Sequence, residues 1–167
     1  YATDYVEKLW PTMYGSRGGV YDFEGSQPTG TPKAGYIWDA CARANVSYRS
    51  YGEFTEVGST PGAHSTTLVK GLEGHFSPTF RGWDMNYSDI DRVNDWEGEF
   101  SEFEKNGGLP QLNIIRLPND HTEGTRKGKL TPRAYVAQND YALGLLVERI
   151  AKSKFWMESA IFVIEDD

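Results

Sequence analysis

The chain has 167 residues, of which 38% are hydrophobic and 14% aromatic, so it can bury one sizeable core and is most simply a single domain over residues 1–167. Its formal charge of -7 argues against nucleic acid as a partner, because binding to phosphate backbones relies on clustered Lys and Arg. No apolar run reaches membrane-spanning length, so no membrane span is expected. The sequence starts without a Met and stops directly after an apolar run, and we interpret it as a piece of a larger polypeptide.

A helix and a strand are predicted near the start of the chain. Thr31 and Pro32 suit the N-cap and the first helical position, and apolar residues at helical spacing follow, which predicts a helix over 32–44. The next residues alternate and are rich in β-prone side chains, which predicts a strand over 46–51. A helix followed by a strand is typical of an α/β fold.

A long irregular segment follows, from Thr55 to Ser88. Gly and Pro recur in it at short intervals, so we expect no regular structure there. It contains too many aromatic residues for a disordered linker, which predicts an ordered loop packed over the sheet edge. Ser88 or Asp89 then caps a helix predicted over 89–106. We interpret the acidic outer face of that helix as solvated, because neighbouring carboxylates along a helix would have to converge on one point to bind a metal ion.

The second half of the chain predicts a β-α-β unit. Apolar runs predict strands over 111–117 and 159–165, and Thr131-Pro132 begins a helix predicted over 132–152 between them. Continuous apolar strands are typical of a parallel sheet that helices cover on both faces. We therefore expect the strands at 46–51, 111–117 and 159–165 to lie parallel in one sheet.

Polar side chains follow both of the last two predicted strands. Asn119, Asp120 and His121 follow the first, and Glu165, Asp166 and Asp167 end the second. Because the carboxyl ends of parallel strands share one edge, where ligands of open α/β sheets bind, we expect the two groups to meet. Carboxylate oxygens suit a hard or borderline divalent cation, so Mg, Ca, Mn and Zn all stay open. On position alone, solvated carboxylates at the end of a fragment are an equal alternative.

The histidines differ in their surroundings. His121 lies beside Asp120 in a loop with three basic residues, which makes it a candidate for contact with a metal ion or a phosphate. His75 lies among aromatic residues of the long loop and alone is a weak signal, and His64 receives no role. No G-x-S-x-G, P-loop or dinucleotide motif is present, so the sequence identifies no nucleophile.

Five segments resemble one known family. They are GHFSPTFRGWD (74–84), the D..R pattern from Asp89, LPNDHTEGT (117–125), TPRAYVAQNDYALGLLVERI (131–150) and SAIFVIEDD (159–167). Together they closely resemble the bacterial phosphoesterase family of the alkaline phosphatase superfamily, which is related to bacterial phospholipases C and acid phosphatases. The resemblance covers most of the chain and is least specific in its first thirty residues. It implies an α/β sandwich with parallel strands, helices on both faces, and a metal site at the carboxyl ends of the strands.

The resemblance also implies roles for individual residues. Asp166 and Asp167 match paired ligands of a divalent metal ion, whose identity stays open among Zn, Ca, Mg and Mn. His121 and His75 match histidines that contact phosphate, and Asp120 matches a carboxylate that either orients that histidine or binds metal. The Ser/Thr nucleophile of the family and its other metal-binding segments are expected outside this chain. The isolated chain is therefore expected to be inactive.

These matches predict that the parent protein is a metal-dependent phosphoesterase, acting on phosphate mono- or diesters such as a small phosphoester or a phospholipid headgroup. They also imply a periplasmic or secreted location in a bacterium. The alternative is a non-catalytic α/β binding or structural module with an incomplete site. A flavodoxin-like binding domain fits the strand and helix order but explains neither the aromatic loop nor the two histidines. Because fold alone does not separate these functions, the residues of the site must decide.

Overall fold

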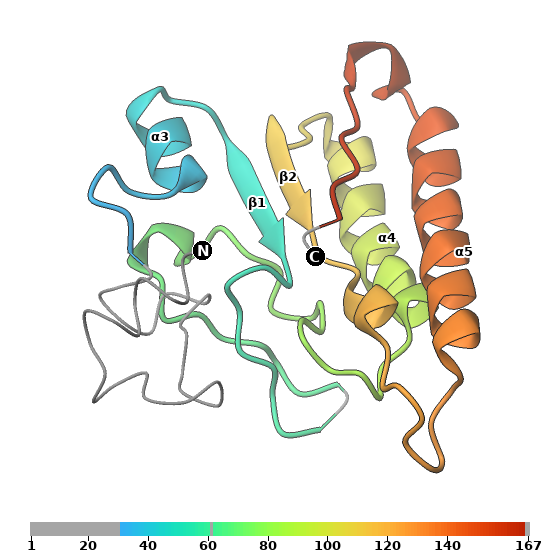
Figure 1. The fold of residues 1–167 in the computed structure, drawn as a ribbon. Coiled ribbons are helices and arrows are strands. Elements are labelled where there is room, and N and C mark those ends of the chain that lie inside the picture. The colour runs from blue at the N-terminus through green and yellow to red at the C-terminus, as the bar shows by residue number, and fades with distance from the viewer. Residues whose placement is uncertain (1–30, 61, 166–167) are drawn as a thin grey trace, which may run out of the picture.

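The computed structural model describes residues 31–60 and 62–165 of the chain. A parallel two-stranded sheet lies at the centre of this part of the fold (Figure 1). Strand β1 (Tyr48–Tyr51) pairs with β2 (Leu112–Ile115), with Tyr48 opposite Leu112 and Tyr51 opposite Ile115. Both strands fall within the runs predicted at 46–51 and 111–117. Their parallel pairing is confirmed, and the fold is of the mixed α/β class.

Three α-helices accompany the sheet in this part of the chain: α3 (Ile37–Arg43), α4 (Asp89–Asn106) and α5 (Pro132–Ala151). Three short 3-10 helices join them: η2 (Lys70–Leu72), η3 (Pro118–His121) and η4 (Trp156–Glu158). The predicted helices at 89–106 and 132–152 are confirmed by α4 and α5. Their starts are predictable because a side chain caps each of them. Ser88 Oγ accepts from the Asp91 amide at 3.0 Å, and Thr131 Oγ1 accepts from the Ala134 amide at 3.3 Å.

The first predicted helix begins later than the sequence suggests. Thr31-Pro32 opens a turn, in which the Gly35 amide donates to the Pro32 carbonyl at 2.9 Å, and α3 starts only at Ile37. Gly35 has a φ of +80°, which an α-helix does not accommodate. The cap is provided instead by Asp39, whose Oδ2 accepts from the Tyr36 amide at 2.7 Å. The predicted start at residue 32 is therefore wrong, although the helix exists.

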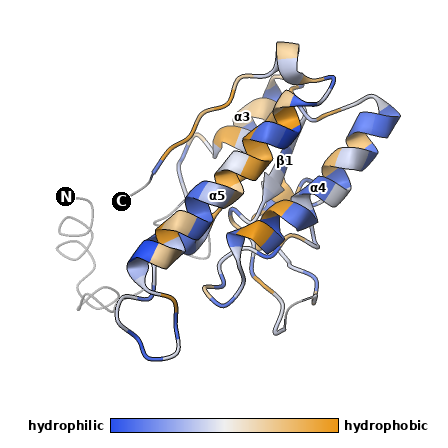
Figure 2. Ribbon diagram, turned by 90° about the vertical axis from the view of Figure 1, so that its right-hand side faces the viewer, coloured by the Kyte–Doolittle hydropathy of each residue, from blue (hydrophilic) through white to orange (hydrophobic). Residues whose placement is uncertain are grey.

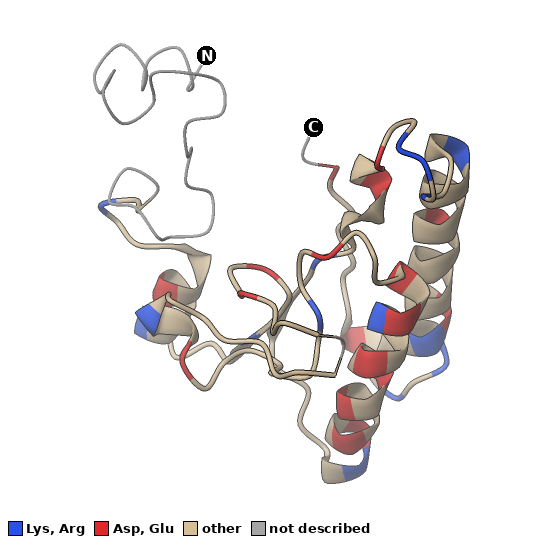
Figure 3. Cartoon of the chain, turned by 90° about the horizontal axis from the view of Figure 1, so that it is seen from below, with Lys and Arg blue, Asp and Glu red and all other residues tan. Residues whose placement is uncertain are grey.

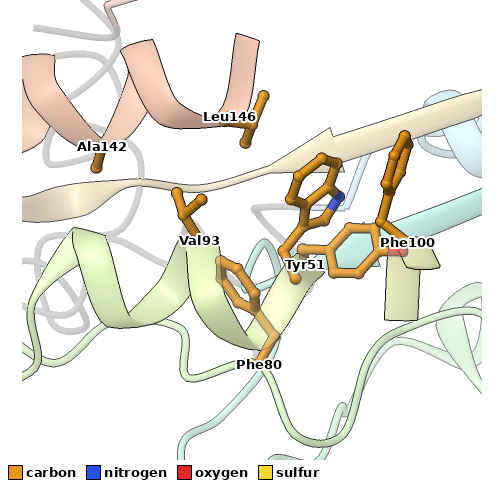
Figure 4. Packing of buried hydrophobic residues seen from close by; sticks show 7 residues of the cluster. Tyr51, Phe80, Val93, Phe100, Ala142 and Leu146 are labelled. Atoms are coloured by element: carbon orange, nitrogen blue, oxygen red, sulfur yellow. The ribbon is translucent and has the colours of Figure 1, made fainter. Parts of the chain in front are cut away.

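Alternation along the strands sends side chains to two cores, one on each face of the sheet. Tyr48 and Leu112 pack with α3, whereas Tyr51 and Ile115 pack with α4 and α5. The larger core contains Tyr51, Phe80, Val93, Trp96, Phe100, Ala142 and Leu146 (Figure 4). The smaller contains Trp38, Tyr48, Val69 and Leu72. Helices therefore cover both faces of the sheet.

The crossover between the two strands contains α4, and α5 packs beside α4 (Figure 2). Arg149 of α5 joins the helices through ion pairs to Glu97 at 3.0 Å and Glu104 at 2.7 Å. Acidic residues gather along the helical layer, as Figure 3 shows. Part of the acidic face of α4 is thus paired with arginine instead of being wholly solvated.

The predicted strand at 159–165 is wrong for the described residues 159–165, which form no strand. Phe162, Val163 and Ile164 are 84%, 66% and 85% exposed, and the run appears as an irregular hydrophobic segment after η4 in Figure 2. An apolar run becomes a central strand only if a sheet edge pairs with it and helices cover both faces. The described residues supply no such partner, so the observed crossover unit is β1–α4–β2.

The long loop from Thr55 to Ser88 is ordered by contacts with the sheet and with α4, as predicted. The Ser50 amide donates to the His75 carbonyl at 2.8 Å and the Ser77 amide donates to the Ser50 carbonyl at 2.9 Å, so residues 75–77 run alongside β1. Farther along, Phe80 is fully buried in the larger core. This path brings the following residues of the loop to the carboxyl end of the sheet.

Candidate functional site

The carboxyl ends of β1 and β2 place two charged side chains together. The chain leaves β1 through Gly52 and Glu53, and it leaves β2 through Arg116, whose amide donates to the Tyr51 carbonyl at 3.0 Å. Arg116 Nε lies 3.5 Å from Glu53 Oε2, and both side chains are only partly exposed. The register of the two strands thus creates an ion pair at the edge where a ligand is expected.

An aromatic residue from the long loop completes this group. The guanidinium of Arg116 lies over the Trp83 ring, 4.9 Å from its centroid, and the His121 ring meets the same indole edge-on with centroids 4.7 Å apart. Both His121 and Trp83 are exposed. We refer to Glu53, Trp83, Arg116 and His121 as the carboxyl-edge cluster. It presents a guanidinium and an imidazole to solvent beside one exposed indole.

The turn that carries His121 is fixed by a buried asparagine. Asn119 is 1% exposed, its amide N donates to Asp89 Oδ2 at 3.1 Å, and its side-chain Nδ2 donates to Gln138 Oε1 at 2.9 Å. The 3-10 helix η3 then ends at His121. Thr122 follows with φ 59° and ψ 175°, a backbone conformation that residues other than glycine rarely adopt. The anchored asparagine and the strained threonine together direct His121 outward.

A buried arginine holds the loop that carries Trp83. Arg92 has no exposure, and it donates to the carbonyls of four loop residues at 2.6–2.7 Å: Arg81, Gly82, Asp84 and Tyr87. Asp89 balances its charge, with Oδ1 2.9 Å from Nη1. Burial raises the pKa of Asp89, against the hydrogen bonds from Asn139, Arg92 and Asn119 that lower it. One network therefore supports both the Trp83 loop and the His121 turn.

A second ion pair stiffens the same loop. Arg81 Nε lies 2.6 Å from Asp84 Oδ2, and the Asn86 amide donates to Asp84 Oδ1 at 2.9 Å. Burial raises the pKa of Asp84, but the hydrogen bonds from Asn86 and Arg81 outweigh it, so the pKa is lowered overall. Asp84 is thus an ionised structural carboxylate beside the cluster.

The site residues predicted from the sequence do not all lie in the carboxyl-edge cluster. His121 lies in the carboxyl-edge cluster, and Asp120 precedes it in η3 with partial exposure. Asp166 and Asp167 lie outside the described residues, so their predicted role as metal ligands stays a prediction. Among residues 31–60 and 62–165, no three His, Cys, Asp or Glu side chains group so as to hold a metal ion.

His75 is not brought to the cluster. Its ring stacks on Tyr48, with centroids 4.3 Å apart, and Tyr48 is the first residue of β1. Three residues of strand, roughly 10 Å, separate that position from the carboxyl end of β1. His75 therefore contacts the first residue of β1, whereas His121 lies beyond the carboxyl end of β2.

Sequence reasoning missed Glu53, Trp83 and Arg116. Arg116 is a cation within the strand predicted over 111–117, and Trp83 is one of several aromatic residues in the loop, so neither position indicates a site by itself. These side chains meet because of strand register and loop path, which no local pattern encodes.

No family model, curated protein or solved structure matches this chain. Within the described ranges, no helix combines the length and apolar character needed to cross a membrane.

Proposed function

We propose that this chain is part of a metal-dependent phosphoesterase of the alkaline phosphatase superfamily type, whose Ser/Thr nucleophile lies outside these residues. The observation that carries the proposal is the carboxyl-edge cluster, in which a guanidinium and an imidazole contact the same indole beyond the ends of two parallel strands. Planar guanidinium groups bind phosphate oxygens through paired hydrogen bonds, and a protonated imidazole adds two donors. The full sandwich of that superfamily is part of the same proposal.

In this proposal Arg116 and His121 donate to the equatorial oxygens of the phosphoryl group and stabilise the charge that grows on them. Trp83 keeps both donors in place, because it contacts each of them. Glu53 restrains Arg116 from the other side. His75 retains only its sequence-based prediction, since its position on Tyr48 gives it no part in this arrangement.

In this proposal Asp166 and Asp167 are the ligands of the divalent metal ion. The carboxylates described at this edge, Glu53 and Asp120, belong to no group of three or more possible ligands, and Glu53 is paired with Arg116. A bound divalent ion would lower the pKa of the attacking hydroxyl and neutralise phosphate charge. Asp120 would then orient His121 or complete the coordination.

The test is hydrolysis of p-nitrophenyl phosphate by the full-length protein that contains this chain. We expect turnover that chelation abolishes and added divalent metal restores, and no turnover by the 167-residue chain alone, because a catalytic unit that lacks its nucleophile loses most of its rate. His121→Ala should lower kcat about 10²–10³-fold. His64→Ala serves as the matched control, since His64 is exposed and distant in sequence from the cluster. Full activity in His121→Ala would overturn the proposal.

If the full-length protein hydrolyses no phosphoester under any metal condition, the non-catalytic binding module becomes the better description. Isothermal titration with inorganic phosphate then distinguishes a binding site from an inert scaffold. Hydrolysis by the 167-residue chain alone would instead show that the nucleophile lies within it.

A further inference from the structure

A cavity of about 320 Å³ opens between the loop before α4, the turn η3 and the first two turns of α5. Its wall combines three carboxamides with apolar surface, from Asn86, Asn119, Gln138, Met85, Leu130 and Tyr135. We refer to it as the amide cavity. Its volume lies near the lower end of the range for ligand pockets, roughly 300–1,000 Å³, so the guest must be small.

The hydrogen bonds that the wall residues already make determine which of their donors and acceptors remain for a bound guest molecule. Asn119 has no donor left for a guest, because Nδ2 donates to Tyr87 O and Gln138 Oε1, and its Oδ1 already accepts from Arg92. Gln138 therefore has its oxygen engaged, and its Nε2 has no partner among the described residues. Tyr135 Oη donates to the Met85 carbonyl at 3.1 Å, which leaves its oxygen able to accept. A guest must accept from Gln138 and donate to Tyr135, and a hydroxyl group does both.

Among the described residues, the lining of the cavity includes one cation, Lys129, and no carboxylate. Lys129 is the cation that lines the cavity, but it lies 3.3 Å from Glu123 Oε1 and donates to Asn86 Oδ1. Glu123 also pairs with Arg126 at 2.6 Å, so the positive charge of Lys129 is only partly neutralised, although its ammonium group already contacts Glu123 and Asn86. The apolar surfaces of Leu130 and Tyr135 suit the C–H faces of a guest, whereas the amides suit its hydroxyls. A small guest rich in hydroxyl groups, such as a polyol or a single sugar unit, matches this wall.

We propose that the amide cavity binds the polyol or sugar portion of a phosphoester. Asn119 lines the cavity and belongs to η3, the same short helix that ends at His121 in the carboxyl-edge cluster. A substrate with its phosphate at the cluster can therefore extend its alcohol portion past η3 into the cavity. The link to a phosphoester rests on the proposed function, whereas polyol binding by the cavity does not depend on it.

The test variant is Gln138→Glu. A glutamate oxygen still accepts from Asn119, so the buried network is kept, while the donor offered to the guest is lost. The matched control is Gln111→Glu, the same substitution at an exposed glutamine whose Oε1 accepts from the Ser47 amide. Leu130→Trp is a second variant that fills the cavity from a loop position that is 44% exposed, so it does not disturb the core.

Saturation-transfer NMR with glycerol and with methyl glucoside, on the full-length protein, measures binding. We expect at least one of the two probes to bind the wild type and Gln111→Glu equally. That binding should weaken about tenfold in Gln138→Glu, as loss of one well-placed hydrogen bond predicts, and disappear in Leu130→Trp. Binding of neither probe to the wild type, or equal binding to all variants, would overturn the inference.

Kinetics separate this inference from the proposed function. For glycerol phosphate, Gln138→Glu should lower kcat/KM about tenfold more than it does for p-nitrophenyl phosphate, which has no polyol. If polyol binding follows the variants but no phosphoester is hydrolysed, the cavity stands and the proposed function fails. If both substrates are hydrolysed and the variant lowers their kcat/KM equally, the proposed function stands and the cavity inference is overturned.

Discussion

Asp89 and Arg92 lie one turn apart at the start of α4 and form an ion pair of 2.9 Å in which neither side chain is exposed to solvent. Arg92 also donates to backbone carbonyls of the loop that carries Trp83 and to Asn119 Oδ1, and Asp89 Oδ2 accepts from the Asn119 amide in the turn that carries His121. The two segments of the candidate site therefore depend on one buried pair.

Replacing Arg92 with Leu should destabilise the protein by about 3–5 kcal/mol, because it leaves Asp89 buried and unpaired. Urea unfolding followed by tryptophan fluorescence measures the free energy of unfolding. Lys105→Leu is the control, since its ion pair to Glu102 is mostly exposed and its loss should change stability little. A stability of Arg92→Leu close to that of the control would show that the loop is held by its own packing instead.

Asp84→Asn should make the free energy of unfolding less dependent on pH. The pKa of Asp84 is lowered in the folded state, so its carboxylate contributes stability above its unfolded pKa, about 3.9, and this contribution is lost as pH falls through the folded value. The difference in stability between wild type and variant should therefore be largest near neutral pH and shrink below about pH 4. Urea titrations at several pH values measure it, and a constant difference would contradict the prediction.

Thr122→Gly should be more stable than Thr122→Ala by about 1–2 kcal/mol. Both variants lose the hydrogen bond that Thr122 Oγ1 accepts from the Gly124 amide, but only glycine relieves the conformation at φ 59° and ψ 175°. The same pair of substitutions at Thr125, which has no positive φ, is the control and should favour alanine. Equal stability of the two Thr122 variants would show that the turn carries no strain.

Metal titration of the full-length protein should separate Asp166 from His121. If Asp166 is a metal ligand, Asp166→Asn should weaken metal binding and recover part of its activity in excess metal. His121→Ala should keep nearly the same metal affinity and lose turnover, since its role is to donate to phosphate. His121→Ala losing metal as severely as Asp166→Asn would make the histidine a ligand instead.

Local signals explain which parts of the fold the sequence predicted. The helices α4 and α5 were predicted with their starts because Ser88 and Thr131 cap them through contacts three residues away. The Thr31-Pro32 signal was the same in composition, but Gly35 at φ +80° turned it into a tight turn. The run at 159–165 is apolar, which predicts a buried strand. The sequence does not specify which neighbouring strand would pair with it, and the run is exposed among the described residues.

The sequence predicts the position of a site residue only where that residue lies close in sequence to the strand that places it. His121 follows β2 by six residues, so placing it at the carboxyl end required only the strand direction. Trp83 and Arg116 are 33 positions apart and meet through the loop path and the strand register, which the sequence does not state locally. His75 was expected at the same edge, yet its ring stacks on Tyr48 and its carbonyl accepts from the Ser50 amide, so it lies alongside β1 and not beyond its carboxyl end.

The way Arg92 holds its loop has a consequence for how this protein can diverge in sequence. The guanidinium binds backbone carbonyls, which every amino acid possesses, so this part of the support for residues 81–87 does not depend on their side chains, whereas the Arg81–Asp84 ion pair does. Gly82 is an exception, because an added Cβ would lie 2.9 Å from the Gly52 carbonyl oxygen. Distant relatives with the same loop are therefore expected to share Gly82, Arg92 and the Arg81–Asp84 pair, with little sequence similarity at the positions between them.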